Sequence, residues 1–137
     1  MSDDSQAVRD VLERFRLGWE ALDPDAVLEC FEPSDATTVI GTDTAEYWRG
    51  YDALVEPFRA MTDAFHAPSY VWAVEPRIEV AGDTAWADGV LDTTLITDAG
   101  VVEAELRSTW VLARRPTGWM VVQAHFSVAP DEPVAEY

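Results

Sequence analysis

Two aspartates give the segment 84–96 its chemical interest, because Asp88 and Asp92 alternate there with small and apolar residues. A carboxyl group enclosed by apolar side chains loses its hydration, which favours the protonated form. Such a group can act as a general base or a general acid, or it can donate a hydrogen bond to a ligand carbonyl. Asp88 and Asp92 are therefore the candidate catalytic residues, with a structural hydrogen bond or exposure to solvent as the alternatives.

The turn after this segment decides on which face of the strand the aspartates lie. Hydrophobicity alone would turn both carboxylates outward. However, residues 98–100, Asp-Ala-Gly, are typical of a three-residue hairpin loop with a left-handed glycine, which sets Thr97 opposite Val101. Counting back along both strands, this register places Asp88 opposite Trp110. We therefore expect both aspartates on the cavity side of the sheet.

The strand-like segment 118–128 contains a histidine whose direction follows from side-chain alternation. Gln123 and His125 share one face, and the other face is uniformly apolar, with Met120, Val122, Ala124, Phe126 and Val128. The apolar set is expected in the core, so His125 is expected on the outer face, together with Arg107 of the preceding strand. A histidine shuttles protons only where it reaches a substrate. This placement favours a structural or interface role for His125.

Other chemistries lack their usual motifs. Two isolated histidines and one cysteine offer no spacing typical of a metal site, and there is no glycine-rich nucleotide loop and no nucleophile elbow. We therefore expect neither a metal nor a cofactor. The single cysteine, Cys30, is expected to be a buried thiol.

The charge is strongly one-sided, with 26 acidic and 9 basic residues and a net charge of −17. Such a surface repels phosphate backbones and anionic lipid, so binding to nucleic acid or to a membrane surface is not expected. No apolar run approaches the roughly 18 residues that span a bilayer, and the acidic N-terminus is unlike a secretion signal. We expect a cytoplasmic protein, and the scattered acids raise the hypothesis of adaptation to high salt.

The elements that must position these residues follow from periodicity. The chain of 137 residues is expected to form a single domain, with its core over about 5–129 and a loose acidic tail over 130–137. Helices are expected first, and a run of antiparallel strands follows them, which is an α+β pattern. The expected helices are 5–22, 24–31 and 51–65, and the expected strands are 36–42, 45–50, 69–81, 83–97, 100–114 and 118–128.

The order of these elements resembles a known family. The run TTVIGTDTAEYWRG before the third helix and the closing run RSTWVLARRPTGWMVVQAHFSV are similar to the SnoaL-like branch of the NTF2-like, or ketosteroid isomerase-like, superfamily. The resemblance implies a cone-shaped, curved antiparallel sheet wrapped around a long N-terminal helix, with a cavity at its wide end. It also implies a homodimer formed through the outer face of the sheet, where Arg107, Gln123 and His125 are the candidate interface residues.

The resemblance also suggests which residues meet a ligand. Aromatic side chains from several elements fall near the expected cavity; they are Trp19, Trp48, Tyr51, Trp86, Trp110 and Phe126. Plain core packing is the alternative for Trp19 and Trp48, and a surface position is the alternative for Tyr51. Asp43 and Glu46 are expected to fix the loop between the first two strands rather than to react. Ketosteroid isomerase uses a tyrosine on the first helix and an aspartate after the first strand, whereas this chain has Phe15 and either Ile40 or Gly41 there. These departures count against steroid-isomerase chemistry.

Two hypotheses of different classes follow, with a purely structural dimer as a third alternative. The first is a homodimeric binding module whose apolar, tryptophan-rich cavity holds a small hydrophobic or aromatic molecule. The alternative is a cofactor-independent enzyme of the polyketide-cyclase or isomerase type, with Asp88, or else Asp92, as general acid and base. The absence of a convincing acid–base pair favours binding.

Overall fold

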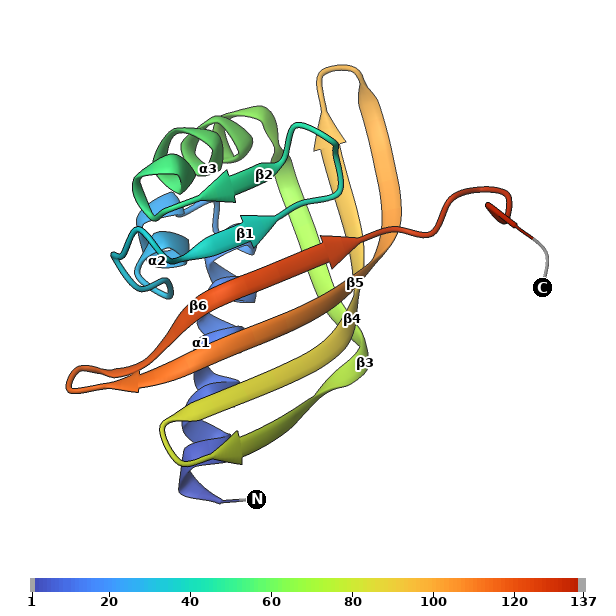
Figure 1. Ribbon diagram of the computed structural model, residues 1–137. Helices are drawn as coiled ribbons and strands as arrows, with labels where there is room; N and C mark the ends of the chain where they lie inside the picture. Colours follow the sequence, from blue (N-terminus) through green and yellow to red (C-terminus); the bar gives the residue numbers. More distant parts are fainter. Residues whose placement is uncertain (1, 136–137) are drawn as a thin grey trace.

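Three helices and two short strands precede four long strands in the computed structural model, which describes residues 2–135 (Figure 1). This order confirms the expected α+β class. The elements are α1 (Asp3–Glu20), α2 (Pro24–Leu28), β1 (Thr38–Ile40), β2 (Tyr47–Arg49), α3 (Asp52–Ala64), β3 (His66–Ala81), β4 (Thr84–Thr97), β5 (Gly100–Arg115) and β6 (Gly118–Ser127).

The strands form one curved sheet in the order β2-β1-β6-β5-β4-β3. All neighbours are antiparallel except β1 and β6, which run parallel. Helix α1 lies across one face of the sheet, while α2 and α3 lie at the end where β1 and β2 are (Figure 1). Residues 129–135 form no helix or strand and are exposed, and positions 136–137 of the expected tail lie outside the described residues. No helix in residues 2–135 is long and apolar enough to cross a membrane.

Helix α1 supplies the apolar stripe that its sequence predicts. Its N-cap is Ser2, whose hydroxyl accepts a hydrogen bond from the Ser5 N–H at 3.1 Å. Residues at three- and four-residue spacing are buried against the sheet, as expected for an amphipathic helix; they are Val8, Val11, Leu12, Phe15 and Trp19.

The register of β4 against β5 differs from the expected one by a single residue. The turn contains only Asp98 and Ala99, so Thr97 lies opposite Gly100. Because side chains alternate, this shift moves every side chain of β4 to the other face. The expectation that Asp88 and Asp92 face the cavity is therefore wrong, and hydrophobicity rather than turn chemistry decided the register.

Small residues on the inner face of β4 make room for bulky neighbours. Ala85, Ala87 and Gly89 point inward and are buried. A Cβ added to Gly89 would lie 2.9 Å from Cζ3 of Trp72 and 3.2 Å from the Cα of Pro76. The sequence interpretation had placed these small residues on the outer face, but the inward side needs them for close packing.

The last strand contains an irregularity that alternation alone did not predict. Val111 lies opposite Gln123 and Leu112 opposite Val121, so Val122 is an extra residue on β6. Trp119 and Val121 are consequently buried, as are Ala124 and partly Phe126 on the other side of the bulge. The prediction that Met120 and Val122 face the core is wrong, while that for Ala124 and Phe126 is confirmed.

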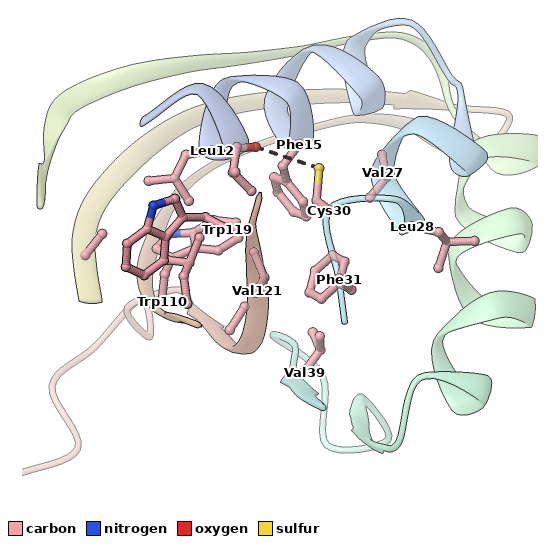
Figure 2. Packing of buried hydrophobic residues seen from close by; sticks show 14 of the residues in the cluster. Leu12, Phe15, Val27, Leu28, Cys30, Phe31, Val39, Trp110, Trp119 and Val121 are labelled. Carbon is pink, nitrogen blue, oxygen red and sulfur yellow. Dashed lines mark hydrogen bonds between the residues drawn. The ribbon is translucent and has the colours of Figure 1, made fainter. Parts of the chain in front are cut away.

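The core lies between α1, α2 and the inner face of the sheet. Figure 2 shows Leu12 and Phe15 of α1 above Trp110, Val121 and Phe31. Cys30 packs in this layer with 2% of its surface exposed, and its thiol donates to the Val11 carbonyl at 3.7 Å (Figure 2). This burial confirms the expected buried thiol, and it raises the pKa of the Cys30 thiol to about 11.

Candidate functional site

A cavity of about 330 Å³ lies between the inner face of the sheet and the helices. Its volume is at the lower end of the range usual for small-molecule sites. Every helix and strand except α2 contributes at least one residue to its walls, and most of these residues are apolar. The lining residues are Phe15, Trp19, Val39, Gly41, Thr42, Glu46, Trp48, Phe58, Met61, Phe65, Tyr70, Leu91, Thr93, Leu95, Val102, Ala104, Leu106, Phe126 and Val128.

Aromatic rings form one continuous part of the wall. The Phe58 ring meets the Trp19 ring at 5.3 Å and the Trp48 ring at 5.9 Å between centroids, both edge-on. Phe15 and Phe126 stack at 5.7 Å with their planes 7° apart. Edge-on and stacked pairs of this kind hold their rings in fixed orientations. The wall is therefore a preformed apolar surface contributed by α1, β2, α3 and β6.

Glu46 is the one charged residue among those that line the cavity. Its Oε1 accepts hydrogen bonds from the backbone N–H groups of Thr42 at 3.0 Å and Asp43 at 3.2 Å. Asp43 Oδ1 in turn accepts from the Ala45 N–H at 2.9 Å. These bonds confirm that Asp43 and Glu46 fix the loop. A Cβ on Gly41 would lie 2.7 Å from the Cβ of Glu46, so the loop also needs glycine there.

Tyr70 of β3 is fixed in the wall by two side chains of α1. Its N–H donates to Glu20 Oε2 at 2.9 Å, and its carbonyl accepts from Arg16 Nη1 at 2.9 Å. Within residues 2–135 these backbone bonds are its hydrogen bonds, and the phenol hydroxyl has no protein partner. Burial, and next the Glu20 carboxylate, raise the pKa of the Tyr70 phenol well above its usual range. The phenol is therefore neutral and free to donate.

Thr93 of β4 places a second hydroxyl at the cavity. It is Tyr70's direct partner across the β3–β4 ladder, so both side chains are on the inner face. Only 4% of Thr93 is exposed, and its Oγ1 is buried without a hydrogen-bond partner in the described part of the chain. Buried hydroxyls are rarely left unpaired.

The six aromatic residues expected to meet a ligand fall into three groups. Trp19, Trp48 and Phe126 line the cavity. Trp110 lies behind its wall, 1% exposed, in edge-on contact with Phe15 and Phe126. Tyr51 precedes α3 and packs against the core away from the cavity, and Trp86 is 47% exposed on the outer face of β4.

The two candidate catalytic aspartates lie outside the cavity. Asp88 is opposite Thr109 on the outer face, and its Oδ2 accepts from Arg77 Nη2 at 3.0 Å. Its side chain is 48% exposed. Asp92 is exposed opposite Glu105 on the same face. The structure therefore brings neither carboxylate near the aromatic wall.

The three candidate interface residues share the outer face. Arg107, Gln123 and His125 are exposed. His125 lies opposite Thr109, and Arg107 lies two residues before Thr109 on β5, opposite Ser127. Arg107 Nε donates to Ser127 Oγ at 3.1 Å. Their expected direction, away from the core, is confirmed, whereas a partner chain that would cover them stays a prediction.

A family model described as a SnoaL-like domain matches residues 8–131, which is nearly the whole described chain. The chain belongs to the SnoaL-like family. No curated protein matches it in sequence.

Solved structures agree with this SnoaL-like assignment at the level of the fold. An NTF2-like superfamily protein from Salmonella enterica is similar with a TM-score of 0.86 and 23% identity, over 97% of this chain and 96% of that one. A ketosteroid isomerase-like protein from Erwinia carotovora has a TM-score of 0.77 and 17% identity, over 95% of this chain and 100% of that one. An NTF2-like protein with a cystatin-like fold from Novosphingobium aromaticivorans has a TM-score of 0.74 and 18% identity, over 95% of this chain and 84% of that one. Identities this low show the shared cone-shaped α+β fold alone.

The lining of this SnoaL-like cavity is mostly apolar. Its walls offer aromatic and aliphatic surface, the hydroxyl-bearing side chains of Thr42, Tyr70 and Thr93, and one carboxylate, Glu46, which is already bonded to its own loop. Among residues 2–135, no three His, Cys, Asp or Glu side chains converge as metal ligands. A ligand would be held by burial of apolar surface and oriented by a few polar contacts.

Sequence reasoning missed Tyr70 and Thr93. Thr93 would have been found with the correct register, because it alternates with Leu91 and Leu95 on the inner face. Tyr70 gave a weaker signal, because β3 has register shifts against β4 on both sides of Val74 that interrupt its alternation.

Proposed function

We propose that this SnoaL-like protein binds a small, largely hydrophobic molecule in the cavity without a cofactor. The observation that carries the proposal is the 330 Å³ cavity with aromatic walls. Trp19, Trp48 and Phe58 hold one another in place, so the wall needs no rearrangement to receive an aromatic or alicyclic body. Apolar cavities are poorly hydrated, which favours their occupation by apolar molecules.

The enzymatic alternative finds less support in the geometry. A general acid and base must come within hydrogen-bond reach of its substrate. Asp88 is bonded to Arg77 on the outer face, and Asp92 is exposed there. Glu46 Oε1 is occupied by two backbone N–H groups. The arrangement therefore favours a binding protein over a cyclase or isomerase that uses a cavity carboxylate.

We also propose that two copies pair through the outer face of the sheet. Exposed apolar residues on this face support the pairing, because large exposed apolar patches are uncommon on monomers; they include Val71, Val74 and Trp86. Arg107, Gln123 and His125 would contribute polar contacts. Sedimentation of the wild type and of Trp86→Ser tests this: a dimer that the substitution converts to monomer supports the pairing, and a monomeric wild type contradicts it. A cytoplasmic location stays a prediction.

Binding is tested with N-phenyl-1-naphthylamine, a neutral probe that fluoresces more strongly in apolar surroundings. The wild type should bind it saturably, one molecule per chain. Ala104→Phe places a ring inside the cavity, because Ala104 lines it, and should weaken binding by about tenfold or more, equivalent to about 1.4 kcal/mol. Ala99→Phe introduces the same ring at an exposed turn and is the matched control. Equal binding to both variants, or no saturable binding to the wild type, would overturn the proposal.

A further inference from the structure

The inner face of the β3–β4 ladder carries two hydroxyls that the fold itself does not use. Tyr70 and Thr93 are direct cross-strand partners, and both line the cavity. Directly opposed side chains in an antiparallel pair have Cβ atoms about 4.5–5.5 Å apart. The two hydroxyls therefore project from neighbouring positions on the same face of the sheet into one cavity.

Neither hydroxyl is satisfied by the protein. Thr93 Oγ1 is buried with no partner in residues 2–135. The hydrogen bonds of Tyr70 in the same range come from its backbone, which leaves its phenol unpaired. A buried hydroxyl without a partner destabilises a fold. Threonine at position 93 therefore weakens the empty protein, whereas valine of nearly the same shape would not.

The position of Tyr70 is also unusually well fixed. Glu20 and Arg16 of α1 bind its N–H and its carbonyl, each at 2.9 Å. Both side chains are held by further ion pairs, because Arg16 also contacts Glu13 at 2.7 Å and Glu20 at 3.4 Å. A fixed backbone orients the phenol before any ligand arrives, which reduces the entropy lost on binding.

The charge of the lining residues restricts the ligand. No lysine, arginine or histidine is among them, and Glu46 is the one carboxylate. An anion would enter an apolar cavity without a cation to pair with, and a cation would compete for a carboxylate that already accepts two N–H bonds. A neutral ligand avoids both costs.

We propose that Tyr70 and Thr93 form the polar anchor of the cavity and that its ligand is an uncharged molecule with a carbonyl oxygen at one end of an aromatic or alicyclic body. Both hydroxyls donate to the carbonyl end, and the body packs against Trp19, Trp48 and Phe58. This inference rests on the proposed binding function and adds the residues that give it specificity.

The test compares two probes of nearly equal shape. 2-Acetylnaphthalene carries the carbonyl, and 2-isopropenylnaphthalene has a methylene group in place of the oxygen. Each is titrated against bound N-phenyl-1-naphthylamine, and the ratio of the two dissociation constants is measured. The wild type should prefer the ketone. Tyr70→Phe and Thr93→Val should each reduce this preference about three- to tenfold, the range expected for one hydrogen bond. 2-Naphthoate at pH 7.5 should bind more weakly than the ketone.

The control is Thr94→Val, which makes the same change one residue along β4, on the outer face. It should leave the ratio unchanged. A second readout is the melting temperature of the empty protein, which Thr93→Val should raise by a few degrees because it removes an unpaired buried hydroxyl. A lower melting temperature would reveal a protein partner for Thr93 and would overturn the anchor.

The two proposals fail in different ways. If the hydrocarbon binds but the ketone is not preferred, or if neither substitution changes the ratio, the anchor is wrong and the binding function stands. If neither probe binds the wild type, the binding function is wrong, and the anchor with it.

Discussion

Asp88 lies directly opposite Thr109 on the outer face of the sheet, one position away from the register that would have placed it opposite Trp110. In the expected register this carboxylate would lie in an apolar cavity. In the observed register it lies near solvent and pairs with Arg77 at 3.0 Å. The chemistry assigned to the chain therefore depends on the register of the β4–β5 hairpin.

Asp88→Asn should consequently have little effect on binding. The substitution removes an ion pair whose two side chains are 76% and 48% exposed, and such pairs contribute about 0–1 kcal/mol. We expect the dissociation constant of N-phenyl-1-naphthylamine to change less than twofold and the unfolding free energy, measured in urea, to change by less than about 1 kcal/mol. A tenfold loss of affinity would place this carboxylate at the cavity.

Ser108→Ala should destabilise the wall behind the cavity. Ser108 Oγ donates to the Gly89 carbonyl at 2.8 Å and accepts from Trp110 Nε1 at 3.0 Å, and both bonds are buried. Alanine leaves a buried donor and a buried acceptor unpaired, so the unfolding free energy should fall by about 1–3 kcal/mol. Ser127→Ala, which removes an exposed bond to Arg107, is the control and should change it by less than about 0.5 kcal/mol. Equal changes in the two variants would mean that the hydrogen bonds of Ser108 add no more to the unfolding free energy than the exposed bond of Ser127.

Asp4 should make stability depend on pH in the acid range. Two hydrogen bonds from Arg114, both 2.8 Å, hold the pKa of the Asp4 carboxyl below its usual value. A lowered folded pKa adds stability above the unfolded value of about 4, and this stability is lost as pH falls through the folded value. Asp4→Asn should therefore be less stable than the wild type at pH 7, and the difference should disappear near pH 2.

Urea unfolding at several pH values measures this difference. Asp3→Asn in the same helical turn is the control, because Asp3 forms no ion pair within residues 2–135. If Asp4→Asn remains less stable than the wild type by the same amount at the lowest pH, the ion pair with Arg114 is not the cause of the lost stability.

Salt should stabilise the protein. Asp92 and Glu105 lie opposite each other on the outer face, and the net charge is −17. Raising the ionic strength from 0.1 to 1 M shortens the screening length from about 10 Å to about 3 Å, which weakens repulsion between such charges. The melting temperature should therefore rise with NaCl, and Asp92→Asn should raise it at low salt more than at high salt. A melting temperature independent of salt would discard the high-salt hypothesis.

The fold was predictable because its main signals are local and agree with one another. The stripe from Val8 to Trp19 predicts α1, and the clean alternation of residues 104–112 predicts which face of β5 is buried. The outward direction of Arg107 and His125 follows from the same alternation. These patterns report burial directly, since a one-residue error would bury a charge.

The candidate site was less predictable because both faces of β4 are plausible from sequence. One face holds small residues and the other holds Trp86 and the aspartates, so hydrophobicity and turn type gave opposite answers. The bulge at Val122 adds one residue to β6, and no local motif marks it. Which residues line the cavity depends on such single-residue shifts, which only the packed sheet reveals.

A crystal structure of the protein with 2-bromonaphthalene tests the central claim, that the cavity holds a small apolar molecule. We expect an anomalous bromine peak inside the cavity, with the naphthalene between the aromatic wall of Trp19 and Phe58 and the inner face of β4 at Leu91. A cavity closed by side chains, with bromine only on the molecular surface, would contradict it.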